Sequence, residues 1–333
     1  MSAAAPSLRR MGPRIGPVNG RLIVLLLALL AVFGLLLGDR LFSGASLRSM
    51  AYQLPELGIL SLAMMVPLLS GGLDLSIIAT ANLVALTVAF LFQVLVPANP
   101  GLAWGVAQVA AVIAGLAVAT VIGAANGVII AYLEVSPILT TLGAMTLLKG
   151  ISIGLTHGGV LSGFPSSIVF IGNGSILGVP VVMLIFIAVA AVMALILNRT
   201  PFGHILHMLG SNEAATRYSG IDTRRVLVRV YVTSSLLAAI AGIVMMARFN
   251  SANASYGESY LLVTILAAVL GGVSPDGGFG KVAGLVFALI ILQLISTAFN
   301  LLNFSQFLTL AIWGGTLIAV AAAVRLRDYF GFL

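Results

Sequence analysis

The chain contains a long uncharged stretch at residues 75–133, which reads LSIIATANLVALTVAFLFQVLVPANPGLAWGVAQVAAVIAGLAVATVIGAANGVIIAYL. One helix needs about 20 mostly apolar residues to cross the hydrocarbon core of a membrane. The stretch is therefore long enough for two helices, separated at the turn-forming sequence PANPG of residues 97–101. Further uncharged windows occupy residues 22–38, 57–73, 150–198, 230–247, 259–275 and 282–324. This pattern predicts a helical protein that crosses the membrane many times.

The overall composition supports the same class of protein. Of the 333 residues, 60% are apolar and 8% are charged, with a mean hydropathy of +1.18, whereas a soluble domain carries roughly a quarter charged residues. The apolar runs are continuous rather than alternating, which excludes a transmembrane β-barrel. Without cysteine the chain has no disulfide, thiolate nucleophile or cysteine-bound metal. The net charge of +7 comes from residues bordering apolar runs, so we expect no nucleic-acid binding.

The turn residues divide the chain into about ten spans of an all-α fold. The predicted spans are 22–38, 53–70, 75–96, 103–133, 136–155, 179–198, 228–247, 259–272, 282–302 and 306–324. We expect a basic cytoplasmic segment at 1–21, one transmembrane domain at 22–324 with a cytoplasmic loop at 199–228, and a cytoplasmic tail at 325–333. This orientation puts most Lys and Arg on the cytoplasmic side, as the positive-inside rule requires. The first span resembles a signal peptide in composition, but we expect it to remain uncleaved.

A weak internal similarity predicts an inverted repeat. The sequence SPILT at residues 136–140 is echoed by SQFLT at residues 305–309, and these begin the fifth and tenth spans. An offset of five spans, an odd number, inverts the second copy relative to the first. Inverted repeats of this kind are common in transporters, and here they would relate spans 1–5 to spans 6–10.

The sequence SGGLDLS at residues 70–76 places a glycine pair and a carboxylate between two apolar stretches. Irregular backbone at membrane depth is tolerated where it is buried in protein or lines a cavity. Asp74 is therefore either a group in a substrate pathway or a cap of the helix that begins near Leu75. Asn82 and Asn126 lie in otherwise apolar helices and are either pathway groups or interhelical hydrogen-bonding groups.

The polar loop at 199–228 is the longest hydrophilic stretch of the chain. Residues 213–218 favour a short helix after Asn212, and Gly220 favours a left-handed end for it. Such a helix is too small to be a domain but suits docking in a groove of another protein. The alternative is a solvated loop that only satisfies the positive-inside rule.

No set of catalytic residues is evident. The only histidines are His157, His204 and His207, and none has a carboxylate or cysteine at metal-ligand spacing. The glycine-rich stretches at 157–163 and 271–280 lack the lysine and hydroxyl residue of a phosphate loop. We therefore expect a transporter rather than an enzyme, with no metal or cofactor of its own. A partner protein or an ion gradient would supply the energy.

Four blocks resemble the permease subunits of bacterial sugar ABC importers of the ribose, xylose and galactose type. The first is residues 70–76, and the second is Asn126-Gly127 with VSPILTTLGAMT at 135–146. The third runs from TPFG at 200–203 through GSNEAA at 210–215 to SGI at 219–221, and the fourth is the glycine-rich block at 267–280. Together they span residues 70–280, and weaker similarity continues to about residue 324.

The resemblance implies a multi-pass protein of the bacterial inner membrane, with both termini in the cytoplasm. It implies three partners: a cytoplasmic ATPase that holds ATP and Mg²⁺, a periplasmic substrate-binding protein, and a second permease copy. Membrane lipid is the remaining contact. The residues expected to couple to the ATPase are Gly210, Ser211, Asn212, Glu213, Ala214, Ala215, Ser219, Gly220 and Ile221. The candidates for the translocation pathway are Gly71, Gly72, Asp74, Ser76, Asn82, Asn126, Thr140 and Thr141.

Two departures from the resembling family bear on the solute. The sequence Tyr260-Leu261-Leu262-Val263 stands where that family commonly has Tyr-Glu-Leu-Asp, and Lys149 stands where arginine is usual. The expected solute is a monosaccharide or a related polyol. The alternatives are a branched-chain amino-acid ABC permease, an ion-driven secondary transporter, which would need intramembrane carboxylates, and a membrane-embedded enzyme.

Overall fold

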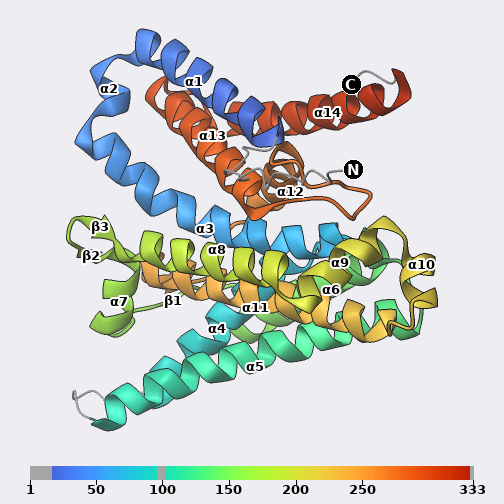
Figure 1. Ribbon diagram of the computed structural model, residues 1–333. Coiled ribbons are helices and arrows are strands. Elements are labelled where there is room, and N and C mark those ends of the chain that lie inside the picture. Colours follow the sequence, from blue (N-terminus) through green and yellow to red (C-terminus); the bar gives the residue numbers. More distant parts are fainter. Residues whose placement is uncertain (1–16, 96–101, 331–333) are drawn as a thin grey trace, which may run out of the picture.

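The computed structural model describes residues 17–95 and 102–330, and within them the fold is all-α apart from four two-residue strands (Figure 1). The helices are α1 (Pro17–Leu37), α2 (Asp39–Phe42), α3 (Gly44–Leu69), α4 (Ile77–Leu95), α5 (Leu102–Tyr132), α6 (Pro137–Thr156), α7 (Ser166–Asn173), α8 (Val181–Arg199), α9 (Pro201–Ser211), α10 (Glu213–Tyr218), α11 (Thr223–Phe249), α12 (Tyr260–Leu270), α13 (Val282–Leu301) and α14 (Gln306–Phe330). Strand β1 (Leu161–Ser162) pairs antiparallel with β4 (Ser251–Ala252), and β2 (Ser175–Ile176) with β3 (Val179–Pro180).

The structure confirms the polytopic helical class but not the number of ten spans. Among the described residues, eight helices are long and apolar enough to cross a membrane: α1, α3, α4, α5, α6, α8, α11 and α13. The predicted eighth span corresponds to α12, whose 11 residues rise only about 16 Å. The predicted tenth span falls in α14, whose apolar part, Phe307–Val320, is also shorter than a full span.

Helix α3 begins nine residues before the predicted second span. Ser43 starts it, because the Ser43 Oγ accepts a hydrogen bond from the backbone N–H of Ser46 at 3.2 Å. Pro55 and Pro67 both lie inside the helix without ending it. The longer helix carries Glu56 into its buried part, where the side chain is 0% exposed.

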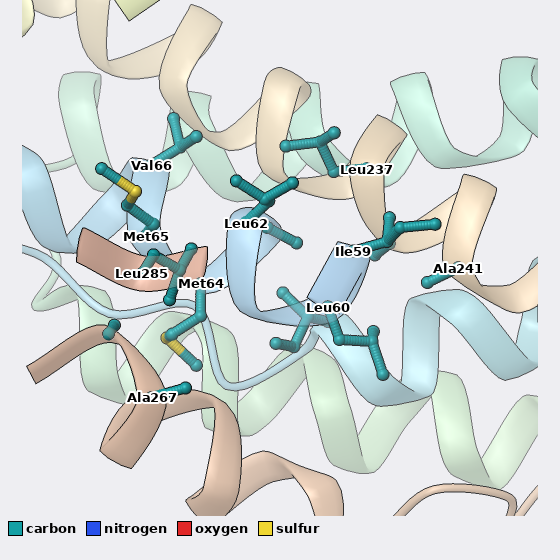
Figure 2. Packing of buried hydrophobic residues seen from close by; sticks show 14 of the residues in the cluster. Ile59, Leu60, Leu62, Met64, Met65, Val66, Leu237, Ala241, Ala267 and Leu285 are labelled. Atoms are coloured by element: carbon teal, nitrogen blue, oxygen red, sulfur yellow. The ribbon is translucent and has the colours of Figure 1, made fainter. Parts of the chain in front are cut away.

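Helix α3 also forms the centre of the molecule. Every residue from 54 to 69 is buried, with α1, α12, α13 and α14 on one side of the helix and α4, α5 and α11 on the other (Figure 1). Figure 2 shows Ile59, Leu62 and Met64 of this helix packed among side chains of α11, α12 and α13. The labelled neighbours are Leu237 and Ala241 of α11, Ala267 of α12 and Leu285 of α13.

Glycines allow α11 to approach α4 and α5 at backbone distance. A Cβ placed on Gly123 of α5 would lie 2.6 Å from the Tyr231 carbonyl oxygen, and one on Gly242 of α11 would lie 2.2 Å from the Ala81 carbonyl oxygen. In lipid, helix association depends on such close packing, because lipid tails are as apolar as the side chains. The position of α11 is therefore set by small residues on both sides of the contact.

Hydrogen bonds at the two ends of α3 join it to segments that are distant in the sequence. On one side the Gly278 N–H donates to the carbonyl of Leu69 at 3.0 Å, which joins the end of α3 to the loop before α13. On the other side the Tyr52 hydroxyl donates to the carbonyl of Asn173 at 3.0 Å, near the start of α3. The loop at residues 199–228, which we call the coupling loop after its expected role, lies on the first side, where Gly210 approaches the Leu69 carbonyl.

We expect Gly123→Val to destabilise the protein, because its side chain overlaps the backbone of α11. Overpacking of this kind costs about 1–3 kcal/mol or more. The measurement is the thermal unfolding midpoint of the purified protein in detergent. The matched control is Gly105→Val on the same helix, where a Cβ meets nothing within 4 Å. Equal midpoints for the two variants would contradict the packing of α5 on α11.

Candidate functional site

The Asp74 carboxylate is the centre of a buried hydrogen-bond network in the signature segment, which we define as residues 70–76. Its Oδ1 accepts from the Ser76 backbone N–H at 3.0 Å and from the Ser76 hydroxyl at 2.6 Å. Its Oδ2 accepts from the Ser234 hydroxyl of α11 at 2.8 Å. Asp74 is 0% exposed and forms no salt bridge within residues 17–95 and 102–330. Three neutral donors therefore satisfy this carboxylate.

Neighbouring helices bind the rest of the signature segment. The Asn126 amide of α5 donates to the Ser76 hydroxyl at 3.0 Å. The Thr141 hydroxyl donates to its own helix at the Pro137 carbonyl, 2.7 Å away, and lies 3.4 Å from the carbonyl of Leu73. The segment thus contacts α5, α6 and α11 at once, and Asp74 bonds to Ser76 within the turn before α4.

Asn82 makes a second polar cross-link. Its Nδ2 donates to the carbonyls of Ala254 at 3.0 Å and Tyr256 at 2.9 Å, so it ties α4 to the segment after β4. Neither Asn82 nor Asn126 lines the pockets described below. Their contacts correspond to interhelical hydrogen bonding, and their role in a pathway stays a prediction. The Thr140 hydroxyl is buried and has no hydrogen-bond partner among the described residues.

Helices α3 and α12 end in the same cap. The N–H groups of Gly71 and Gly72 donate to the carbonyls of Leu68 and Pro67, both at 3.0 Å, and Gly71 has a φ of +82°. At the end of α12, the N–H groups of Gly272 and Val273 donate in the same pattern to Val269 and Ala268. This is a Schellman motif, in which a left-handed residue satisfies the last carbonyls of the helix. Each cap lets the chain leave the helix sharply into a glycine-rich loop.

Four glycines bring three of the sequence blocks together, and we call this contact the glycine junction: Gly71, Gly210, Gly277 and Gly278. A Cβ on Gly210 would lie 2.0 Å from the Leu69 carbonyl oxygen, and one on Gly277 would lie 2.8 Å from the N of Gly71. His207 Nδ1 also lies 3.1 Å from the carbonyl oxygen of Gly278. Helix α9, the end of α3 and the loop before α13 therefore meet backbone to backbone.

The coupling loop folds into two helices, of which the second has the predicted bounds. The Asn212 Oδ1 accepts from the Ala215 N–H at 2.9 Å and caps α10 at its start. Gly220, with a φ of +81°, follows its end as predicted. Thr216 is buried and anchors α10, whereas Ser211, Asn212, Glu213, Ala214, Ala215, Ser219 and Gly220 are exposed and Ile221 is half-buried. Helix α9 was not predicted.

A pocket of about 520 Å³ opens between α10 and the turn that joins α5 to α6. Its wall includes the backbone of residues 70–72 and the side chains of Glu213, Arg217 and Tyr231. Across it, the Arg224 Nη2 and Glu134 Oε1 atoms form a salt bridge of 3.1 Å. Gly71 and Gly72 therefore border this pocket, whereas Asp74, Ser76 and Asn126 lie outside it.

The chain matches a protein family over most of its length. The family model described as "Branched-chain amino acid transport system / permease component" matches residues 46–321. The chain belongs to this family. Among its relatives, the ribose import permease protein of Bacillus subtilis (strain 168) is 31% identical over 321 residues, covering 96% of this chain and 92% of the relative. The ribose import permease protein of Haemophilus influenzae (strain ATCC 51907 / DSM 11121 / KW20 / Rd) is 32% identical over 318 residues, covering 94% of each chain.

A third relative has a different printed solute. The L-arabinose transport system permease protein of Escherichia coli (strain K12) is 31% identical over 271 residues, covering 81% of this chain and 80% of the relative. No solved structure matches the permease at a significant level.

Sequence analysis missed a buried ion pair in this permease. The Arg248 Nη1 of α11 lies 2.6 Å from the Glu56 Oε1 of α3, and the two side chains are 19% and 0% exposed. Both residues border uncharged windows, at 57–73 and 230–247, and nothing in the local sequence indicates that they pair. Ser234 and Tyr231 were also missed, because nothing local distinguishes a hydroxyl that reaches another helix.

The two departures from the sequence pattern of sugar ABC permeases, at Lys149 and at residues 260–263, both lie near the start of α12. Lys149 Nζ forms a salt bridge of 2.8 Å with the Glu258 Oε1. Tyr260 and Val263 occupy the first turn of α12 and line a second pocket, of about 190 Å³. His204 and His207 contact different parts of the chain. His204 Nδ1 lies 2.9 Å from the Thr200 carbonyl oxygen, whereas His207 Nδ1 contacts Gly278 of the glycine junction.

We expect Asp74→Ala to destabilise this permease more than Asp74→Asn. Alanine leaves the donors of Ser76 and Ser234 without an acceptor, at about 1–3 kcal/mol for each buried group. Asparagine keeps an oxygen for Ser76, and the Ser234 hydroxyl can rotate to accept from the new amide. The measurement is the unfolding midpoint of each variant in detergent, with Ser234→Ala as the control that removes one donor only. Equal midpoints for the two Asp74 variants would contradict the network.

Proposed function

We propose that this permease is the membrane subunit of a bacterial ABC importer for a monosaccharide or a related polyol. In this proposal two permease copies form the translocation pathway in the inner membrane, a cytoplasmic ATPase with ATP and Mg²⁺ drives transport, and a periplasmic binding protein delivers the solute. The observation that carries the proposal is helix α10, which is exposed. Helix α9 directly precedes it and contacts the end of α3 through the glycine junction. The printed solutes of the relatives support a sugar.

The coupling step follows from that contact. A partner that moves α10 also moves α9, and Gly210 transmits the displacement to the Leu69 carbonyl without intervening flexible side chains. The signature segment begins at that point, so the displacement reaches residues that border the larger pocket. Only a partner that binds the two conformations with different affinity shifts their populations, and in this proposal the ATPase does so on binding ATP. The coupling loop and both termini then face the cytoplasm.

The second copy has a surface that fits it. Helix α6 exposes Leu139, Leu142, Leu147 and Ile151, and a groove along this face is floored by Gly143 and Gly150. Small residues let helices approach closely within lipid. We infer that α6 packs against the partner copy.

The alternative solute is a branched-chain amino acid, because the family description names one. A zwitterion calls for free charged partners, whereas the buried Glu56 and Arg248 pair with each other. An ion-driven transporter would need a carboxylate that an ion can reach. Asp74 is fully buried and bound by three donors, which favours a structural role for it.

We expect the double variant Glu213→Arg with Gly220→Val to uncouple ATP hydrolysis from uptake while the protein still reaches the membrane. The reversed charge alters the first turn of α10, and valine is strained at the left-handed φ of +81°. The measurement is ATPase activity and solute uptake in proteoliposomes that contain the complete importer. The control is Gly158→Val, which has a φ of +74° and no neighbour within 4 Å. Normal uptake by the double variant would contradict the coupling assignment.

We expect the tagged permease, purified in mild detergent from its host, to bring an ATPase subunit with it. The exposed α10 docks in that subunit, so the double variant should recover less of it under the same conditions. Mass spectrometry identifies and quantifies the co-purified chains. A permease that is recovered alone would favour an ion-driven transporter, and uptake driven by an ion gradient would then be measured.

A further inference from the structure

A pocket lined by both polar and apolar side chains lies at the end of α3 that is farthest from the coupling loop. The pocket has a volume of about 190 Å³ and is enclosed by α3, α12, α13 and α14. Most of its polar lining comes from Gln53, Tyr260, Gln293, Ser296, Thr309 and Trp313. Gln53 and Ser70 are 17 positions apart on or beside α3, which corresponds to about 25 Å along the helix axis. None of the predicted pathway residues lines this pocket.

Two glutamine amides form an ordered wall of the pocket. The Gln293 Nε2 donates to the Gln53 Oε1 at 3.2 Å and to the Thr297 Oγ1 at 3.4 Å. The Gln53 Nε2 donates in turn to the Ser49 hydroxyl at 2.8 Å. Gln293 is only 5% exposed, so its amide is held in one orientation. This leaves its carbonyl oxygen as an acceptor at the pocket.

An indole ring forms another wall. Trp313 of α14 is 8% exposed, and its ring lies 6.2 Å from that of Phe299. Phe299 stacks in turn on Phe304 at 5.1 Å, so the aromatic side chains hold the indole in place. Rigid aromatic faces next to amide and hydroxyl groups offer apolar contact to C–H groups and hydrogen bonds to hydroxyls, which is the mixed chemistry of a sugar.

The lining contains no charged side chain. The nearest buried charges, Glu56 and Arg248, neutralise each other at 2.6 Å. Val263 supplies an apolar side chain, and the remaining lining residues are apolar or bear hydroxyl groups. A neutral solute suits such a site, because an amino-acid zwitterion would lose its hydration without gaining a charged partner.

Hydrogen bonding between helices does not by itself explain why these polar side chains surround an open pocket. Polar side chains between membrane helices usually bond to each other, as Gln53 and Gln293 do. Here hydroxyl and indole groups from five further positions surround a space that stays open. Ligand sites in helical proteins are commonly such spaces between helices, with a few polar groups that fix the orientation of the ligand.

We propose that this pocket binds a neutral polyhydroxyl solute of about pentose size within each permease copy, before the solute passes toward the coupling-loop side. The inference rests on the proposed function, which makes this end the side that receives solute. Gln293 and Gln53 bind hydroxyl groups, and Trp313 packs against the carbon face of the ring.

The chain provides its own reporter for the test. It has two tryptophans, Trp104 and Trp313, so Trp104→Phe leaves only the indole in the pocket. The full-length variant, in lipid nanodiscs, is titrated with D-ribose, L-arabinose and L-leucine while the fluorescence is recorded. We expect a saturable change with at least one of the two sugars and none with L-leucine.

A second substitution links the signal to the pocket. Gln293→Leu in the Trp104→Phe background should raise the half-saturating sugar concentration about tenfold, since a buried polar contact is lost. Gln108→Leu is the matched control, because Gln108 is also buried but lies on α5 outside the pocket, bonded to Ser167. Unfolding midpoints establish that each variant is folded.

The outcomes separate this proposal from the proposed function. No saturable change with either sugar, or a change with L-leucine instead, overturns the pocket assignment. Uptake by the complete importer at an unchanged rate and half-saturation with Gln293→Leu overturns it too, while the importer function stands. If the unmodified importer takes up neither sugar, it is the proposed function that fails for these solutes.

Discussion

A chain that leaves a helix among buried side chains must find protein partners for every free backbone and polar group, because no water is there to supply them. The signature segment meets this constraint with the Schellman cap at Gly71 and Gly72 and with the bonds of Asp74 to Ser76 and Ser234. These contacts fix α4, α5 and α11 around the end of α3. The carboxylate is expensive to bury, and its three donors are what make the irregular backbone stable there.

The glycine junction limits how far the coupling loop can move relative to the end of α3. Side chains with free rotation would absorb a displacement of the coupling loop, but the contacts of Gly210 and Gly277 join backbone to backbone. Helix α3 is buried along residues 54–69 and connects the glycine junction to the opposite side of the molecule. The two pockets lie near the opposite ends of this helix. In the proposed mechanism, a conformational change at the coupling loop would reach both pockets, as alternating access requires.

Local chemistry made some features predictable and left others out of reach. Helix α10 has its predicted bounds because Asn212 and Gly220 act within one or two turns of the positions they cap. The start of α3 was placed at residue 53 instead of residue 44, where the Ser43 hydroxyl caps the helix, and Glu56 stays buried inside the helix because it pairs with Arg248. The span of α12 was overestimated because an apolar run continues past Leu270, where Gly272 turns the chain.

The sequence by itself determined that this is a polytopic helical membrane protein with a short helix in a polar loop, since apolar run length and capping residues act over a few turns. Its glycine blocks were visible, but not that residues 71, 210 and 277 meet. Only the tertiary structure decided that Asp74 bonds to Ser234, that Glu56 pairs with Arg248, and that Gln53, Gln293 and Trp313 line one pocket. Asp74 and Ser234 are 160 residues apart, Glu56 and Arg248 are 192 apart, and Gln53 and Gln293 are 240 apart, so packing of whole helices is what selects these partners.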